Sequence, residues 1–266
     1  MPYACIPLQA IGAPLKRAAF VIALCAAALA SPAANAWNWS HGFGSPVAGS
    51  GRIKTETRAV SGFTGVALSV GASVEILQGN AERVVIQADD NILPLVETVV
   101  ENGTLKIRAA RGEGSFAASK LNLTVYAKSI DALSIAGGGA INAAALRSPA
   151  LKASIAGAGD IGIDALEAGE LDVDIAGSGD FSAAGHAARL HASIAGMGDV
   201  KAANLDAKAV EVSIAGSGDA IVWARDTLRV SVVGAGEVKY YGDARVHRSI
   251  VGAGEINRLG AAPAAS

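Results

Sequence analysis

The sequence is poor in cysteine, in aromatic residues and in charged residues. Its two cysteines, Cys5 and Cys25, both lie within residues 1–36, which we expect to be removed as an export signal, so no disulfide can stabilise the mature protein. Aromatic residues make up 5% and charged residues 17% of the 266 residues. A fold of small, stacked side chains with many turns suits this composition better than a globule with an elaborate active site.

The chain also carries little net charge. The formal charge is −2 at pH 7, and removal of the signal takes away Lys16 and Arg17, which lowers it by two, to −4. This mildly acidic balance gives no electrostatic basis for binding nucleic acid or anionic lipid. We therefore expect no nucleic-acid partner.

The N-terminal segment has the features of a cleaved export signal. Lys16 and Arg17 precede an apolar stretch at 18–30, and a small-x-small cleavage site ends at Ala36. The apolar stretch is too short and too rich in alanine to favour a membrane anchor. A lipoprotein anchor at Cys25 is disfavoured, because the residue before it is a leucine rather than a small residue. We predict an exported protein, periplasmic or extracellular, with no membrane span after cleavage.

One heptapeptide, close to Ser-Ile-Ala-Gly-x-Gly-Asp, occurs seven times in the second half of the chain. The copies are Ser134–Ala140, Ser154–Asp160, Asp174–Asp180, Ser193–Asp199, Ser213–Asp219, Ser231–Glu237 and Ser249–Glu255. Their starts are 20, 20, 19, 20, 18 and 18 residues apart. This short period, with strand-forming residues around a Gly-x-Gly turn, is typical of a stacked solenoid. We predict an all-β, right-handed parallel β-helix of about seven coils, because left-handed tubes usually show a hexapeptide rhythm that is absent here.

Alternation of apolar and polar residues assigns the faces of each coil. The residues expected to point inward are Leu151/Ala153/Ile155, Leu171/Val173/Ile175, Leu190/Ala192/Ile194, Val210/Val212/Ile214 and Leu228/Val230/Val232. A second column follows each turn, at Ile161/Ile163, Phe181/Ala183 and Val200/Ala202. A third lies eight residues ahead of the heptapeptides, at Leu146, Leu166, Leu205, Trp223 and Tyr241. Three columns predict a three-sided tube, in which the 19-residue step places Gly185 or His186 in the third column.

The segment ahead of the repeats predicts strands of a different kind. Apolar-alternating runs at 96–101 and 104–108 flank Asn102-Gly103, the strongest short signal for a β-hairpin. We expect these irregular strands to close one end of the tube. The stop signals at the other end are Arg248, Arg258 and Pro263. The predicted boundaries are 1–36 for the signal, 37–58 for a flexible Gly/Ser-rich leader, 59–258 for a single solenoid domain (N-terminal strands 59–126, repeats 127–258) and 259–266 for a disordered tail.

The two glycines of each heptapeptide are predicted to be structural turn residues. They are Gly157, Gly159, Gly177, Gly179, Gly196, Gly198, Gly216, Gly218, Gly234, Gly236, Gly252 and Gly254. A sharp corner between strands needs a positive φ or a close approach of two backbones, which glycine accepts without strain. A phosphate-binding loop also contains Gly-x-Gly, but it needs a following helix and one copy rather than seven. We therefore assign no nucleotide site and no cofactor.

The last residue of the heptapeptide forms an acidic column. Its members are Asp160, Asp180, Asp199, Asp219, Glu237 and Glu255, with Ala140 as the exception. Like charges about 4.8 Å apart repel by about 1 kcal/mol in bulk water and about 3.5 kcal/mol at an effective dielectric of 20, so the carboxylates need compensation. We favour hydrogen bonds from turn N–H groups. The alternative is weak Ca²⁺ binding at Asp160, Asp180, Asp199 and Asp219, although calcium-binding solenoids place the aspartate one residue later.

No catalytic constellation is evident in the sequence. The four histidines, His41, His186, His191 and His247, show no metal-ligand spacing, and no Ser/His/Asp arrangement stands out. Asp180 and Asp199 could form an acid/base pair for glycoside hydrolysis, but an active site should differ from the coils around it, and this column is uniform. Trp223, Tyr240 and Tyr241 could form a carbohydrate platform, but we expect Trp223 to be part of the core.

The heptapeptide and the strands before it resemble the head GIN domain family, a domain of unknown function labelled as an autotransporter adhesin. The resemblance covers residues 59–258 and rests on the order of the motifs ahead of the repeats, Gly62-Phe63, Val74–Gly79, Asp90–Leu93 and Asn102–Ile107. It implies an exported β-helical domain of the bacterial envelope. It implies no chemistry, because the family has no established catalytic residues to transfer.

We predict a non-enzymatic, exported β-solenoid that presents flat, repetitive faces for adhesion or for contact with the cell envelope. The outward column is Ser154, Asp174, Ser193, Ser213, Ser231 and Ser249. Such a column suits weak, multivalent contact with an envelope or extracellular glycan or protein surface. The alternative is a carbohydrate-active β-helix that cleaves or binds polysaccharide.

Overall fold

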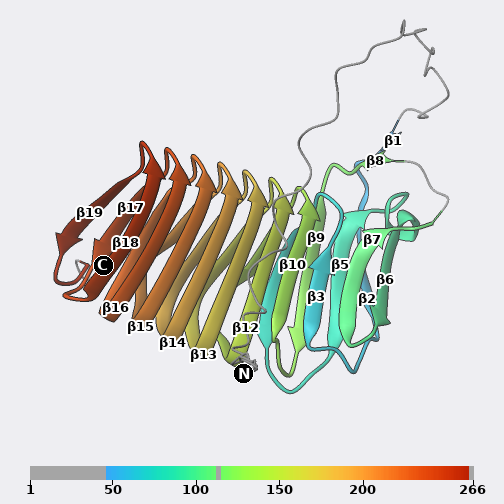
Figure 1. Ribbon diagram of the computed structural model, residues 1–266. Helices are drawn as coiled ribbons and strands as arrows, with labels where there is room; N and C mark the ends of the chain where they lie inside the picture. Colours follow the sequence, from blue (N-terminus) through green and yellow to red (C-terminus); the bar gives the residue numbers. More distant parts are fainter. Residues whose placement is uncertain (1–45, 112–114, 264–266) are drawn as a thin grey trace, which may run out of the picture. The chain divides into compact units, whose positions relative to one another are not determined.

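Figure 1 shows the computed structural model, which describes residues 46–111 and 115–263. Within this part of the chain, the protein consists of strands and one short 3-10 helix. No helix among these residues is long and apolar enough to cross a membrane. The predicted signal at 1–36 with Cys5 and Cys25, and the leader up to residue 45 with His41, lie outside the described residues.

The first strands of the chain build one end of the solenoid. The elements are β1 (Val47–Ala48), β2 (Ile53–Arg58), β3 (Gly65–Leu68), β4 (Ser73–Gln78), β5 (Arg83–Asp89), the 3-10 helix η1 (Leu93–Leu95), β6 (Val96–Glu101), β7 (Thr104–Ala109), β8 (Phe116–Ala117) and β9 (Leu121–Ala127). β3 and β4 form a coil that pairs in parallel with β7 and β9 on one side. Beyond these two strands the pairing is antiparallel: β6 pairs with β7, β5 pairs with β9, and β2 pairs with β5. The change of direction ends the parallel stack, as the sequence predicted.

The hairpin predicted at Asn102-Gly103 joins β6 and β7. Both turn residues have positive φ, 53° at Asn102 and 74° at Gly103. Positive φ at both central residues defines a type I′ turn, whose twist matches that of the paired strands. The short helix η1 lies directly before this hairpin and contains Pro94.

Residues 53–58 differ from the sequence expectation, which placed them in a flexible leader. They form β2, which is exposed over most of its length and pairs antiparallel with β5. Arg58 ties this strand to the cap, because its guanidinium donates to the backbone oxygens of Val96 at 2.5 Å and Leu93 at 2.9 Å. The strand is polar, so no hydrophobic alternation was present to predict it.

The repeats form a parallel solenoid in which each coil lies on the coil before it (Figure 1). The strands are β10 (Ala132–Gly137), β11 (Ala140–Ala143), β12 (Leu146–Gly157), β13 (Asp160–Gly177), β14 (Asp180–Gly196), β15 (Asp199–Gly216), β16 (Ala220–Gly234), β17 (Glu237–Tyr241), β18 (Arg245–Gly252) and β19 (Glu255–Gly260). β10 and β11 stack on β3 and β4, and every heptapeptide pairs in register with the next copy. The predicted stack of coils is confirmed, with about six turns.

Each coil is divided into three paired segments. In β13 they cover residues 161–163, 166–168 and 170–177, with interruptions of the pairing between them. All residues predicted to point inward in the first two columns are buried. The interior is therefore filled by apolar side chains from three sides, which stabilises coils that could not fold singly.

The third column is occupied as predicted in the coils of β12 to β15. Leu146, Leu166 and Leu205 are buried. In the 19-residue coil, Gly185 pairs with Leu166 on one side and with Leu205 on the other. A Cβ at Gly185 would lie 2.2 Å from the carbonyl oxygen of Leu166, so the close approach of two backbones requires glycine here.

Trp223 is not a core residue, contrary to the sequence expectation. It is half-buried and pairs with Asp206, and Tyr241 pairs with Trp223 on the next coil. The prediction was wrong because residues 203–205 have no counterpart in β16. The position eight residues ahead of the heptapeptide, which points inward in the longer coils, therefore points outward at Trp223 in this shorter coil.

The C-terminal end has no antiparallel cap within the described residues. β18 and β19 are exposed along most of their length. Arg248 pairs with Val230, and Arg258 donates its Nε–H to the carbonyl oxygen of Gly242 at 2.9 Å. Because β19 continues to Gly260, the first two residues of the predicted tail belong to a strand.

Candidate functional site

Each Gly-x-Gly turn brings successive backbones into contact. At Gly196 the φ angle is +136°, and a Cβ there would lie 2.2 Å from the carbonyl oxygen of Gly177. A Cβ at the second glycine, Gly198, would lie 2.4 Å from the carbonyl oxygen of Gly179. Both positions thus exclude a side chain because of stacking, and neither turn leads into a helix that could hold a phosphate.

The carboxylates of the acidic column accept hydrogen bonds from the next coil. The backbone N–H of Asp180 donates to Asp160 Oδ1 at 3.3 Å, and that of Glu237 donates to Asp219 Oδ1 at 2.8 Å. Asp199 Oδ1 accepts from the N–H of Asp219 at 3.3 Å in the same way. The carboxylates therefore compensate turn amides, which is the interaction that the sequence analysis favoured.

Lysine side chains neutralise part of this column. Lys201 Nζ lies 2.6 Å from Asp180 Oδ2 and 4.0 Å from Asp199 Oδ2. The hydrogen bond to Asp180 raises the pKa of Lys201. Lys239 Nζ lies 2.7 Å from Glu237 Oε2 and lowers the pKa of that carboxyl. A Ca²⁺ ion between Asp180 and Asp199 would have to displace Lys201, and no three acidic or histidine side chains of the described residues are grouped to hold a metal.

The three histidines among the described residues lie on the outer surface. His186 Nδ1 is 3.6 Å from Asp206 Oδ2, and His191 Nδ1 is 3.8 Å from Glu211 Oε2. Both histidines belong to β14, and each faces a carboxylate of β15. His247 is exposed on β18.

The outward side of the heptapeptides forms a flat surface, which we call the GIN face. It consists of the column Ser134, Ser154, Asp174, Ser193, Ser213, Ser231 and Ser249, and of the column Ala136, Ala156, Ala176, Ala195, Ala215, Val233 and Val251. Every residue of the second column is exposed. Val233 is 56% and Val251 65% exposed, so the face becomes more apolar toward the C-terminal end.

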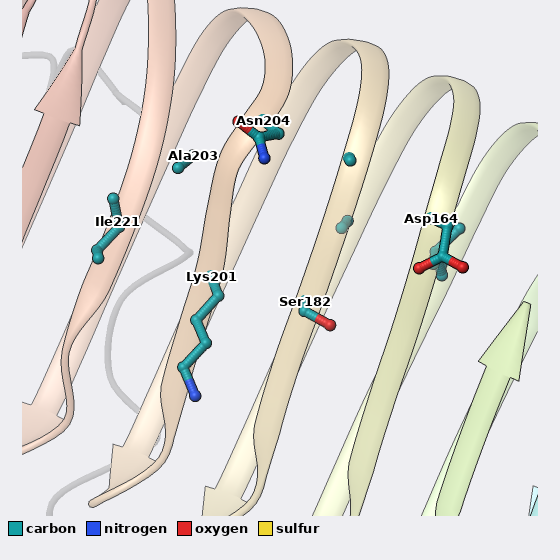
Figure 2. A pocket seen from close by; sticks show the side chains of 9 residues that line it. Asp164, Ser182, Lys201, Ala203, Asn204 and Ile221 are labelled. Atoms are coloured by element: carbon teal, nitrogen blue, oxygen red, sulfur yellow. The ribbon is translucent and has the colours of Figure 1, made fainter. Parts of the chain in front are cut away.

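A shallow hollow of about 290 Å³ lies on another side of the tube and is lined by residues of β13 to β16. Figure 2 shows that its polar side chains come from successive coils, with Asp164, Ser182 and Lys201 spread along the solenoid axis. Asn204 lies at the corner above Lys201 (Figure 2). Because these groups do not converge, the hollow lacks the hydrogen-bonded nucleophile and base that nucleophilic catalysis needs.

A column that the sequence analysis missed runs beside a second hollow, of about 410 Å³. We call it the mixed column: Arg147, Glu167, His186, Asp206, Trp223 and Tyr241, paired one to the next over six coils. Arg147, Glu167 and His186 also line that hollow. The missed signal was the unequal length of the coils, which moves Trp223 and Tyr241 into this column.

Solved structures share this fold. A "putative adhesin" from Bacteroides fragilis NCTC 9343 has a TM-score of 0.75 and 26% identity, and the match covers 80% of this chain and 100% of that one. A "putative lipid binding protein" from Parabacteroides distasonis ATCC 8503 has a TM-score of 0.69 at 24% identity, over 81% of this chain and 100% of that one. A "putative adhesin" from Parabacteroides merdae ATCC 43184 has a TM-score of 0.64 at 20% identity, over 80% and 98% of the two chains. The last two matches show the fold alone.

No curated protein matches the sequence significantly. The family comparison, in contrast, matches residues 62–244, from the strand region ahead of the repeats into the sixth heptapeptide coil. The resemblance noted in the sequence is thereby confirmed, and the chain belongs to the family described as "Putative auto-transporter adhesin, head GIN domain".

Proposed function

We propose that the protein is an exported, non-enzymatic, adhesin-like module that makes weak, multivalent contacts through the GIN face. The observation that carries the proposal is the exposure of this face. Its serine and alanine columns stand in register over seven heptapeptides, and the alanine column is exposed from end to end. Similar, mostly small side chains repeated about every 4.8 Å can meet a repetitive partner at many points.

The state of the carboxylates supports a non-enzymatic role. A glycosidase needs one carboxylic acid that donates a proton and one free carboxylate. In the acidic column, Asp180 is bonded to Lys201, and Asp199 accepts the N–H of Asp219. Groups held in this way serve the coil stack, and the repetition leaves no single pair distinguished from its neighbours.

Export is supported by family membership and by the signal features at 1–36. The family description names an auto-transporter adhesin, which acts outside the cytoplasm. Expression of the full chain in a bacterial host should yield a product that begins at Trp37 and leaves the cytoplasm. Mass spectrometry of the N-terminus after cell fractionation tests this, and an intact N-terminus in the cytoplasm would contradict it.

The contact role is tested with the mature chain, residues 37–266, displayed on beads. Binding to bacterial envelopes and to extracellular matrix proteins is expected at high display density and should be lost for the monomer, since avidity can exceed single-site affinity by about 10² or more. The triple variant Ala176→Arg, Ala195→Arg, Ala215→Arg should abolish binding. The matched variant Asp164→Arg, Ser182→Arg, Asn204→Arg, on another side, should retain it. Equal binding by both variants, or polysaccharide cleavage that Asp180→Asn abolishes, would overturn the proposal.

A further inference from the structure

The mixed column is a strip of varied side chains on the outer surface. It places one side chain per coil in register over six coils, whereas the GIN face repeats serine and alanine. The side chains of Arg147 and Glu167 are 82% and 66% exposed, that of His186 is 46% exposed, and that of Asp206 is 23% exposed. The strip is therefore reachable by a ligand that follows the solenoid axis.

Two aromatic rings continue the strip. Trp223 lies between the buried residues Val222 and Ala224, so it points to the opposite side of the strand, outward. Tyr241 pairs with Trp223, whereas its neighbour Tyr240 packs against the core. Among the described residues, few aromatic rings are neither buried nor packed against the core.

On the next coil, the residue that pairs with Tyr241 has no side chain. Gly260 pairs with Tyr241, and a Cβ at Gly260 would lie 4.0 Å from Tyr241 Cδ1. Glycine therefore adds no side chain beyond the tyrosine ring. The rings end the strip as an amphipathic surface, with apolar ring atoms and a polar N–H or O–H.

The charges along the strip alternate and compensate one another. Arg147 Nε lies 2.8 Å from Glu167 Oε2, and Arg225 Nε lies 2.8 Å from Asp206 Oδ1. His186 lies between these two carboxylates in the register. A polyanion would meet Glu167 and Asp206, and a polycation would meet the arginines. Hydroxyl groups, which both donate and accept, can bond to every member of the strip.

We propose that the mixed column binds a linear, uncharged polysaccharide laid along the solenoid axis. The sugar rings stack on Trp223 and Tyr241, and the hydroxyls bond to Glu167, His186 and Asp206. The hollow beside Arg147 and Glu167 accommodates the chain at the other end of the strip. The proposal goes beyond the adhesin-like contact role, because it assigns an additional ligand to a different surface from the GIN face.

The test uses residues 37–266 with Trp37→Phe and Trp39→Phe, which leave Trp223 as the only tryptophan. Neutral hexasaccharides of glucose, xylose, mannose and N-acetylglucosamine are titrated, with oligogalacturonate as the acidic probe. At least one neutral oligosaccharide is expected to shift the Trp223 emission in a saturable manner, and oligogalacturonate is not. In the tryptophan-complete chain, calorimetry should show affinity reduced about tenfold or more by Trp223→Ala or Tyr241→Ala and largely kept by Trp223→Phe.

Circular dichroism and the melting temperature establish that each variant is folded. If Trp223→Ala does not fold, the shift of the Trp223 emission and the oligosaccharide affinity of Glu167→Gln test the proposal instead. The GIN-face triple variant is the matched control and should bind the oligosaccharide normally. Absence of binding to any neutral oligosaccharide, or equal binding by all mixed-column variants, would overturn this inference. Density-dependent adhesion by the same preparation would then leave the proposed function standing.

Discussion

The turn glycines offer the sharpest prediction about stability. In Gly196→Ala, the new Cβ would have to form at φ +136°, 2.2 Å from the carbonyl oxygen of Gly177. A non-glycine residue in this region of φ costs about 1–3 kcal/mol. Relief of the contact requires a backbone shift between two stacked coils. This shift costs a further amount of about 1–3 kcal/mol, similar to the cost of overpacking a core. We expect Gly196→Ala to lower the free energy of unfolding by about 2–6 kcal/mol.

The matched control is Gly138→Ala, at the middle position of the first heptapeptide turn. A Cβ at Gly138 meets nothing within 4 Å, and its φ is not in the positive region. Ala158 and Ser178 occupy the equivalent position in the next two copies. The control should therefore stay within about 0.5 kcal/mol of the wild type. Urea unfolding followed by circular dichroism measures both variants. A Gly196→Ala protein as stable as Gly138→Ala would refute the close approach of the coils.

Three further changes test other parts of the structure. Ile194→Ala removes a side chain that is 1% exposed in the middle of the stack, and should destabilise the protein by about 2–5 kcal/mol in the same urea assay, whereas Met197→Ala, at a residue that is 68% exposed, should have little effect. Lys201→Ala removes the ammonium group shared by Asp180 and Asp199, and should lower the free energy of unfolding by at most about 1 kcal/mol. Because these groups are well exposed, the difference from the wild type should shrink in high salt. A difference that does not depend on salt would contradict the electrostatic explanation. Asp89 is buried, and the hydroxyl of Ser119 together with the N–H groups of Ser119 and Gly51 lowers its pKa in the folded state against the opposing effect of burial. Because the pKa of Asp89 is lower in the folded than in the unfolded state, its ionisation stabilises the protein above the unfolded value of 3.8, and this stabilisation is lost as the pH falls through the folded pKa. The free energy of unfolding of Asp89→Asn should therefore depend less steeply on pH below about 4 than that of the wild type. An equal pH dependence of the two proteins would contradict this.

The repeats made most of the solenoid predictable from the sequence. A period of 18–20 residues with alternating apolar positions determines which side chains are buried, because only one register brings all of them inside. The predicted hairpin likewise followed from local chemistry, since Asn102 and Gly103 both accept positive φ. Hydrogen bonds from turn amides to Asp160, Asp199 and Asp219 were also expected, but their donors lie one coil further along the chain.

The parts that were missed depend on contacts distant in the sequence. β2 is a polar edge strand that exists because β5 offers it hydrogen-bonding partners and Arg58 reaches the cap. Trp223 was assigned to the core because the prediction assumed the same number of residues at the corners of every coil. β16 lacks three residues at one of its corners. The mixed column became visible only once the register between coils was known.

The most direct test of the account is the distance between coils in solution. Spin labels at Ser154→Cys paired with Ser193→Cys, Ser213→Cys, Ser231→Cys or Ser249→Cys sample positions two to five coils apart in the register of the GIN face. Residues 37–266 contain no cysteine, so only the introduced pairs are labelled. The account predicts narrow distance distributions that lengthen by about 4.8 Å per coil, to about 24 Å between the sites at Ser154 and Ser249. Broad distributions, or distances that do not rise in equal steps, would contradict the stacked solenoid.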